Sequence, residues 1–143
     1  MRSRFFSRGM RLLVVGIATL VATSVPLAPA HATYGAQQPI HLQLFSPTAQ
    51  QVGLLDGWIQ FDDGNLQFRY SLTITRQSSF TQPFVDVFVN GTFVVQWTGS
   101  VTDERTFAST VVNVRFVFHG SSFTGPGNFR EHVKTVTYDN PYN

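Results

Sequence analysis

The sequence predicts an all-β protein, a single-domain antiparallel β-sandwich of about seven strands. Apolar and polar residues alternate with a period of two through most of residues 57–138, and no stretch there has a helical period. Turns that contain Gly, Asn and Pro separate the alternating runs at short intervals, as they do in antiparallel sheets. The strands expected after residue 107 are long for a small sandwich, so a small closed β-barrel is the alternative.

Residues 1–32 have the three parts of a secretory signal peptide. Residues 12–25 are apolar, and Ala30-His31-Ala32 fits the pattern at which signal peptides are cleaved. The basic head that precedes them contains Arg2, Arg4, Arg8 and Arg11. We therefore expect a secreted, extracellular protein that is cleaved after Ala32 and whose all-β domain spans residues 33–143. No segment of this domain has the roughly 18 apolar residues of a spanning helix, so we expect no membrane span.

The charge of the domain differs from that of the whole chain. The chain has 10 Lys and Arg against 8 Asp and Glu, and four of those basic residues are the arginines of the signal peptide. The six that remain oppose all eight acidic residues, which gives the domain a net charge of −2. The domain has no basic stripe, so we expect no nucleic-acid partner. The chain has no cysteine, so packing without disulfides must hold the domain together.

Seven segments are expected to be strands, and residues 46–56 are expected to be irregular. The seven are residues 41–45, 57–61, 66–76, 84–89, 92–98, 107–119 and 129–138. The connections between most of them are short, which favours antiparallel neighbours in the sheets.

The second and third segments form a hairpin if residues 62–65 are the loop between them. Phe68 and Tyr70 then alternate with polar residues along a strand that has one face in the core and one in water. In this register Trp58 lies across from Arg69, where a cation–π contact is within reach.

The loop of this hairpin is rich in oxygen ligands, which raises the question of a calcium site. Asp62 and Asp63 begin the loop, but the longer alternation of ligands and the distal bidentate Glu of a calcium loop are missing. Asp, Gly and Asn are also the residues that a tight turn requires. We therefore expect a turn, with calcium binding at Asp62 and Asp63 as the alternative.

The fourth and fifth segments are joined by Asn90-Gly91, the strongest short-range signal for a hairpin, because a type I′ turn needs positive φ at both central residues. A regular register pairs Phe88 with Phe93 and Phe84 with Trp97. One face of the ribbon is then rich in valine, and the other carries Phe84, Asp86, Phe88, Phe93, Val95 and Trp97. Asn90-Gly91-Thr92 also fits the N-glycosylation pattern, which we interpret first as a turn.

Both faces of this ribbon are apolar, but only one can face the core of a two-layer sandwich. If residues 46–56 or the N-terminal tail cover the aromatic side, its rings are structural. If the side is open, the rings form a platform for a ligand, and Asp86 can accept hydrogen bonds from sugar hydroxyls. A carboxylate without a donor is costly in a sealed core, so we expect this side to be at least partly wet.

The last two segments are expected to pair across a loop at residues 120–127, which places His132 opposite Arg115. His41, His119 and His132 do not have the spacing of metal ligands, so we expect no metal site and no cofactor.

Catalysis has one carboxylate pair as a candidate, Asp86 and Glu131. The sequence has no G-x-S-x-G or H-E-x-x-H motif. Ser121 and Ser122 lie in the expected loop, with no evident base beyond His119.

These observations favour a secreted, non-catalytic binding module for an extracellular glycan or a small amphipathic ligand. The expected ligand-binding residues are Phe84, Asp86, Phe88, Phe93 and Trp97. The alternative is a protein–protein module, such as an inhibitor, an envelope component or a homo-oligomer, that uses the same face. A second alternative is a small glycan-active hydrolase with the paired carboxylates.

Overall fold

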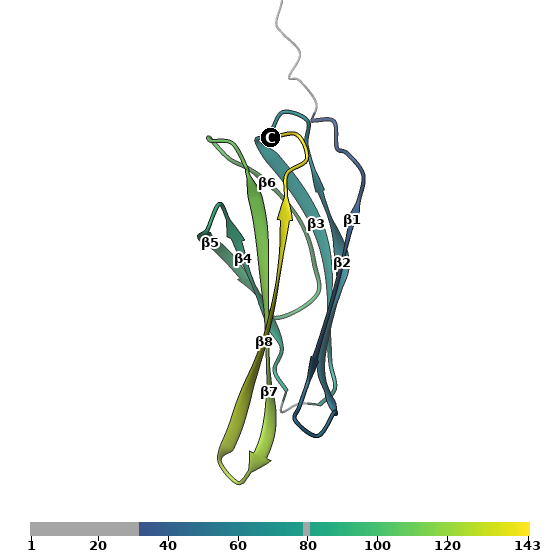
Figure 1. Ribbon diagram of the computed structural model, residues 1–143, viewed down its shortest axis with the longest axis vertical. Helices are drawn as coiled ribbons and strands as arrows, with labels where there is room; N and C mark the ends of the chain where they lie inside the picture. Colours follow the sequence, from purple (N-terminus) through teal and green to yellow (C-terminus); the bar gives the residue numbers. More distant parts are fainter. Residues whose placement is uncertain (1–31, 79–80) are drawn as a thin grey trace, which may run out of the picture. The chain divides into compact units, whose positions relative to one another are not determined.

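Two four-stranded antiparallel sheets pack face to face in the computed structural model, which describes residues 32–78 and 81–143 (Figure 1). Sheet I has the strand order β1-β2-β3-β6, and sheet II has the order β5-β4-β7-β8. The strands are β1 (Gln38–Phe45), β2 (Gln51–Phe61), β3 (Gln67–Arg76), β4 (Phe84–Val89), β5 (Thr92–Trp97), β6 (Val101–Thr106), β7 (Asn113–Gly125) and β8 (Asn128–Asp139). The predicted β-sandwich is confirmed, and the described strands do not close into a barrel.

The predicted signal peptide, residues 1–32, lies outside the described residues except for Ala32. Cleavage after Ala32 therefore stays a prediction. Within residues 32–78 and 81–143, the structure has no helix that is long and apolar enough to cross a membrane.

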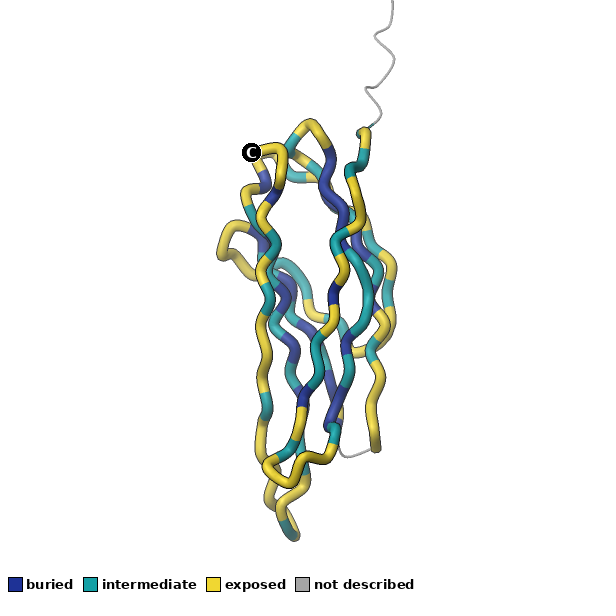
Figure 2. The backbone as a smooth tube through the Cα atoms, turned by 45° about the vertical axis from the view of Figure 1, so that its right-hand side comes forward, coloured by how far each residue is buried: buried dark blue, intermediate teal, exposed yellow. Residues whose placement is uncertain are grey.

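The core lies between the sheets and is built by the inward residues of the alternating strands. Strands β2 and β3 turn Ile59, Phe68 and Tyr70 inward, and β7 turns Phe116 and Phe118 inward, all with 0% exposure. Their burial removes large apolar surfaces from water, which is the main favourable term in folding. Figure 2 shows the buried residues within the strands of both layers, and exposed residues at the turns and along parts of the edge strands.

The β2–β3 hairpin pairs two residues away from the predicted register. Phe61 lies opposite Phe68, and Trp58 lies opposite Ser71. The predicted contact of Trp58 with Arg69 is therefore wrong. The slip is by an even number of residues, so the side chains of both strands keep their predicted faces.

Asp62 sets this register because its side chain closes the turn. Its carboxylate accepts hydrogen bonds from the backbone N–H groups of Gly64 and Gln67. Its own N–H donates to the carbonyl of Gln67. Leu66 begins the predicted strand and would share the inward face of Phe68 and Tyr70 there, but it is 40% exposed in the shifted loop. Both carboxylate oxygens of Asp62 serve the turn, which favours the turn interpretation of this loop.

The sequence pattern does not predict strand β6. Its inward positions are Val101, Asp103 and Arg105, so the apolar–polar alternation of a strand is missing. Arg105 Nε donates to Asp103 Oδ2 at 2.7 Å, which satisfies both charges at the edge of the core. Strand β2 also differs from the prediction, because it already begins at Gln51 within the segment 46–56.

The last hairpin is longer than predicted. Strands β7 and β8 pair through most of the predicted loop, as far as the turn that follows Gly125. His132 therefore does not lie opposite Arg115, as the shorter hairpin predicts. Strand β4 begins at Phe84, opposite His119, so beyond this point β8 is the only strand of the described residues that pairs with β7. The two strands form a ribbon beyond the sandwich core, at the bottom of Figure 1.

The predicted turn at Asn90 and Gly91 is confirmed, with φ values of 51° and 82°. The Asn90 side chain also fixes the approach to β7. Its Oδ1 accepts hydrogen bonds from the N–H groups of Val112 (2.8 Å) and Asn113 (3.2 Å). Its Nδ2 donates to the Thr110 carbonyl at 2.7 Å. The amide of the glycosylation pattern is thus engaged within the fold, which supports the turn interpretation.

We expect Asn90→Ala to lower the free energy of unfolding by about 2–3 kcal/mol, because three hydrogen bonds are lost and an alanine must adopt positive φ. Urea unfolding measures this loss. Asn128→Ala, at the exposed start of β8, is the matched control and should change the value by less than about 0.5 kcal/mol. Equal effects of the two substitutions would contradict the role of Asn90.

Candidate functional site

The outer face of sheet II carries the predicted binding residues of β4. Val85 and Val87 point into the core and are fully buried. Phe84, Asp86 and Phe88 alternate with them and lie half-buried on the opposite side. The aromatic side of this strand therefore faces away from the core. All strands of the described residues belong to the two sheets, so no further strand layer covers this side.

Neither segment considered as a cover lies on this face. Residues 46–50 form the turn between β1 and β2 of sheet I, and Tyr34 bridges to Asp62, which is also in sheet I. Phe93 on β5 is 54% exposed. We refer to the outer face of sheet II as the aromatic face, and its central residues are Phe84, Asp86, Phe88, Phe93, Arg115 and His119.

Trp97 does not belong to the aromatic face, so its predicted place there is wrong. Phe88 pairs with Phe93 as predicted, but the register then shifts and Val87 pairs with Val95. This β-bulge adds one unpaired residue to β5, so the side chains that follow turn to the other face.

The bulge is favourable because of the side chains that it places inside the sandwich. A regular register would point the Gln96 amide into the core and the Trp97 indole to solvent. With Val94 as the extra residue, Gln96 lies outside and Trp97 packs against the core. Burial of the larger apolar ring, without a buried amide, decides the register.

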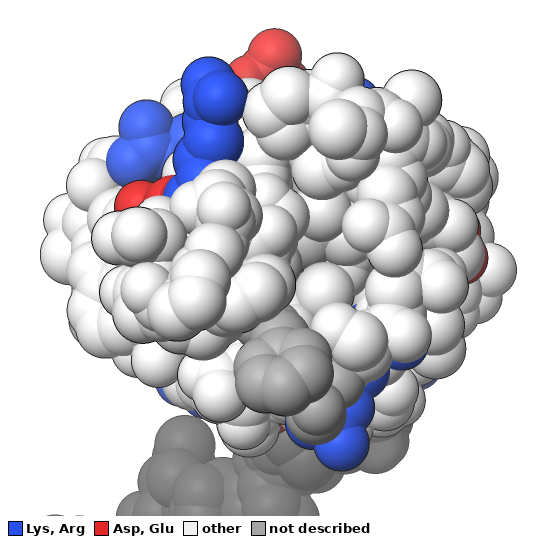
Figure 3. All heavy atoms as spheres, turned by 90° about the horizontal axis from the view of Figure 1, so that it is seen from below, with Lys and Arg blue, Asp and Glu red and all other residues white. Residues whose placement is uncertain are grey.

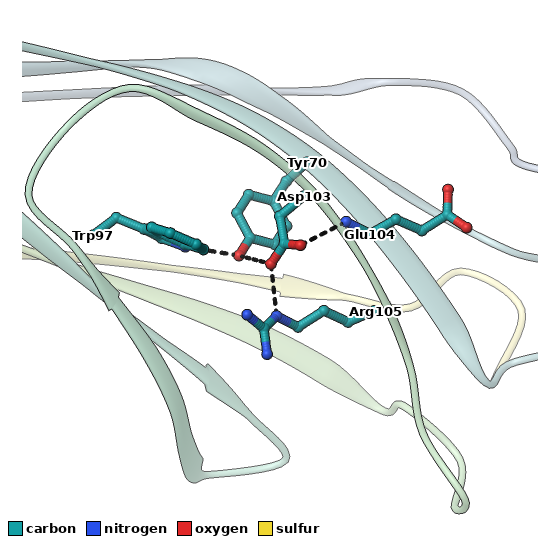
Figure 4. A network of polar contacts seen from close by, with 5 residues as sticks. All are labelled: Tyr70, Trp97, Asp103, Glu104 and Arg105. Atoms are coloured by element: carbon teal, nitrogen blue, oxygen red, sulfur yellow. Dashed lines mark hydrogen bonds and ion pairs between the residues drawn. The ribbon is translucent and has the colours of Figure 1, made fainter.

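Trp97 joins the two sheets through a chain of hydrogen bonds (Figure 4). Its Nε1 donates to the Tyr70 hydroxyl at 2.9 Å, and that hydroxyl donates to Asp103 Oδ2 at 2.9 Å. Arg105 donates to the same carboxylate oxygen. The four residues come from β5, β3 and β6, so the network holds together the edges of both sheets. Burial raises the pKa of Tyr70 to about 12, because the phenolate would be poorly solvated there.

A polar chain crosses the centre of the aromatic face. Gln96 Nε2 donates to Asp86 Oδ1 at 2.8 Å. Asp86 Oδ2 lies 3.4 Å from His119 Nε2, and Glu131 Oε1 lies 2.9 Å from His119 Nδ1. Asp86 and Glu131, which are far apart in the sequence, therefore contact the two nitrogens of one imidazole.

The rings of the aromatic face are held by contacts with one another and with β7. The Phe84 ring stacks on the His119 ring with 4.4 Å between centroids and 7° between planes. The Arg115 guanidinium carbon lies 4.5 Å from the Phe88 centroid. Phe88 and Phe93 meet edge to face, with centroids 5.7 Å apart. Because these rings are already held in place, they would lose little further side-chain entropy when a ligand binds to them.

A hollow of about 370 Å³ adjoins Arg115 at one end of the aromatic face. Its lining residues are Asn90, Gly91, Asn113, Arg115 and Thr137. It therefore adds amide, guanidinium and hydroxyl groups next to the rings, which is the combination that small polar-apolar ligands require.

The arrangement of Asp86 and Glu131 bears on the hydrolase alternative. Two glycosidase carboxyl groups face each other across an open gap that holds the scissile bond. Here the His119 ring lies between the two groups and contacts both. This geometry favours binding over catalysis by the carboxylate pair.

The structure gives Ser122 a base that the sequence did not reveal. Ser122 Oγ lies 2.7 Å from His132 Nε2, and Ser122 lines a hollow of about 640 Å³ between the β1–β2 turn and β7. The predicted register of the last hairpin did not place Ser122 and His132 next to each other. A nucleophile needs a base that is itself oriented. Among the described residues, no hydrogen bond orients the second ring nitrogen of His132, so the pair lacks the third member of a catalytic triad.

The three histidines of the domain lie in different places. His41 contacts Asp56 on the outer face of sheet I, and His119 lies on the aromatic face. His132 lies on the inner side of the β7–β8 ribbon, beside Ser122. In the part of the chain that the structure describes, no group of three or more His, Cys, Asp or Glu could hold a metal ion.

No protein-family model, no curated protein and no solved structure matches this chain. Its function has therefore to be inferred from the geometry of the aromatic face and from the chemistry of the side chains there. The fold alone indicates no function, because the same architecture can carry unrelated sites.

We expect Tyr70→Phe to lower the free energy of unfolding at neutral pH by about 1–3 kcal/mol, because Trp97 Nε1 loses its acceptor and Asp103 loses a donor. The raised pKa adds a pH dependence. The folded protein keeps the phenol proton up to about pH 12 and the unfolded chain loses it near its ordinary pKa of 10.0, so stability falls across this window. Urea unfolding should show a smaller alkaline loss for Tyr70→Phe than for the wild type. Parallel losses would contradict the assignment.

Substitution of the two rings of β5 should separate their roles. We expect Trp97→Ala to cost about 2–4 kcal/mol, because its indole is half-buried against the core. Phe93→Ala should cost less than about 1 kcal/mol, because its ring is 54% exposed. Thermal and urea unfolding measure both losses, and the reverse order would show that the regular register applies.

Proposed function

We propose that this domain is a secreted, non-catalytic module that binds an extracellular glycan or a small amphipathic ligand on its aromatic face. The binding residues are Phe84, Asp86, Phe88 and Phe93, together with Arg115 and His119. Trp97 is not among them. The observation that carries the proposal is a carboxylate held between rings, on a sheet face that no other strand layer of the described residues covers.

Sugars have apolar ring faces and polar rims, and the aromatic face offers partners for both. Phe88 and Phe93 supply flat apolar area, and Phe93 is largely exposed. Asp86 already accepts one hydrogen bond from Gln96, and an ionised carboxylate has further acceptor sites for hydroxyl groups. His119 fixes the orientation of this carboxylate, so the site is organised before a ligand arrives.

Secretion is the second part of the proposal and depends on the signal peptide. The basic head, the apolar segment and the cleavage pattern after Ala32 support it. The net charge of −2 would disfavour strongly anionic glycans and would not oppose the binding of neutral ones.

A protein partner is the second candidate, and one observation favours it. Four large apolar side chains on this side of sheet II are more than 40% exposed, which is typical of an interaction surface. They are Phe93, Phe123, Phe129 and Val133. Light scattering of residues 33–143 would detect a homo-oligomer that uses this surface.

Asp86→Ala tests the glycan proposal. We expect the wild-type domain to bind at least one member of a panel of soluble polysaccharides and amphipathic small molecules in titration calorimetry. The variant should bind it about tenfold more weakly, because a charged acceptor is lost. Asp56→Ala is the matched control, because Asp56 also pairs with a histidine, His41, but on the outer face of sheet I.

Two results would overturn the proposal. One is wild-type affinity of Asp86→Ala for the bound compound. The other is the absence of binding to the whole panel by a domain that light scattering shows to be a dimer, which would favour the protein interface. If the wild type hydrolyses a polysaccharide and Asp86→Asn abolishes this activity, the result would instead support the hydrolase alternative.

A further inference from the structure

Cross-strand rows that contain aromatic rings cross the outer side of β7 at regular intervals and extend well beyond the centre of the aromatic face. Arg115, His119 and Phe123 are four residues apart and lie on one side of the strand, since side chains alternate with a period of two. Each of the three stands in a cross-strand row that contains aromatic rings. Together the rows extend the aromatic face along the β7–β8 ribbon.

The three rows are defined by the strand register. In the first, Arg115 neighbours Phe88, which pairs with Phe93. In the second, Phe84 pairs with His119, and their rings are stacked.

The third row lies near the tip of the ribbon, where Phe123 pairs with Phe129. Their centroids are 5.7 Å apart, and the planes meet at 65°. These rings are 55% and 56% exposed, so neither contributes much to the core. Two large rings kept in water at a hairpin tip indicate a contact surface.

Hydrogen-bonding groups fill the rows between the rings. Asp86 and Gln96 lie between the first and second ring rows, in the row of Val117 and Thr135. Ser121 pairs with Glu131 between the second and third. Rings and polar rows therefore alternate along the strand direction.

We propose that the aromatic face binds a single linear, neutral polysaccharide chain that runs along β7 and β8 and stacks on all three ring rows. This inference rests on the function proposed above and names its ligand class. Four residues of strand span about 13 Å, so the rows from Arg115 to Phe123 cover about 26 Å. A single sugar ring could contact only one row, whereas a chain of several sugars could contact all three.

The charge along this track supports a neutral chain. Asp86 and Glu131 lie in the polar rows and outnumber Arg115 of the first ring row, so the track disfavours a polyanion. Both carboxylates can accept hydrogen bonds from hydroxyl groups. Figure 3 views the ribbon end of the domain, where uncharged residues make up most of the surface and both basic and acidic side chains lie toward its margins. An anionic lipid surface or a nucleic acid would require a continuous basic patch instead.

The twist of the ribbon further restricts the ligand. Figure 1 shows β8 crossing from one side of β7 to the other along their length, as expected for a strongly twisted two-stranded ribbon. Successive ring rows are therefore rotated relative to one another. A flexible soluble chain can follow this rotation, and the flat surface of a crystalline polymer cannot.

The test combines ligand length with a variant of the tip. Calorimetry would measure the affinity of residues 33–143 for xylan and mixed-linkage glucan, and for size-fractionated oligosaccharides of each. For at least one of them, we expect affinity to rise with chain length up to several sugars. Phe123→Ala combined with Phe129→Ala should weaken long-chain binding by about tenfold and leave short-chain binding unchanged, because only long chains reach the third row.

Two further variants control this experiment. Phe45→Ala removes a ring of similar exposure, 46%, from sheet I and should change neither affinity. Phe123→Tyr combined with Phe129→Tyr keeps the aromatic surface, so it should retain long-chain affinity. Unchanged short-chain binding by the alanine variant shows that its loss of long-chain affinity is not a folding defect.

The possible failures point to different errors. If short and long chains bind equally, or if the alanine variant keeps full long-chain affinity, the extended site is wrong and the central aromatic face alone binds. If the wild type binds none of these saccharides, the extended site has no support and the glycan part of the proposed function fails with it. Loss of binding to anionic vesicles by the same variant, without saccharide binding, would identify the tip as a lipid contact.

Discussion

One extra residue in β5 determines both the interior and the exterior of sheet II. Because Val94 leaves the ladder, the Trp97 indole turns inward to Tyr70 and Gln96 turns outward to Asp86. The same local irregularity therefore ties the edges of the two sheets together and supplies a donor to the polar centre of the aromatic face. In this domain the bulge decides which side chains of β5 face the core and stabilise the fold, and which face outward and are open to solvent.

The two outer faces of the sandwich differ in how many of their side chains are engaged in contacts with one another. On sheet I, Arg69 stacks on Tyr34 and donates to Gln60, while Ser71 bonds to Thr102. These contacts form a largely polar surface, on which the Trp58 ring is half-buried. On sheet II the polar groups form one narrow chain, and rings are exposed on both sides of it. The contrast supports the proposal that the aromatic face is the interaction surface.

The sequence was sufficient for features that depend on local pattern. Period-two alternation predicted the sandwich, and Asn90-Gly91 predicted its turn, because both follow from backbone geometry alone. The sequence was not sufficient for features that depend on contacts between residues far apart in the chain. The charged inward side chains of β6 need Tyr70 as a partner from β3, so no local alternation reveals that strand. The place of Trp97 depends on the same tyrosine, and the meeting of Asp86 with Glu131 depends on the pairing of three strands.

The position of the two indoles has a spectroscopic consequence. Trp97 lies inside against Tyr70, and Trp58 lies on sheet I opposite Pro39 and Ser71, so neither borders the aromatic face. Intrinsic emission from this domain should therefore be nearly silent when a saccharide settles on the phenylalanines. The emission should change instead when the sheets separate and water reaches the Trp97 ring. Trp97 fluorescence therefore reports on the packing of the two sheets and is a poor probe of ligand binding to the aromatic face.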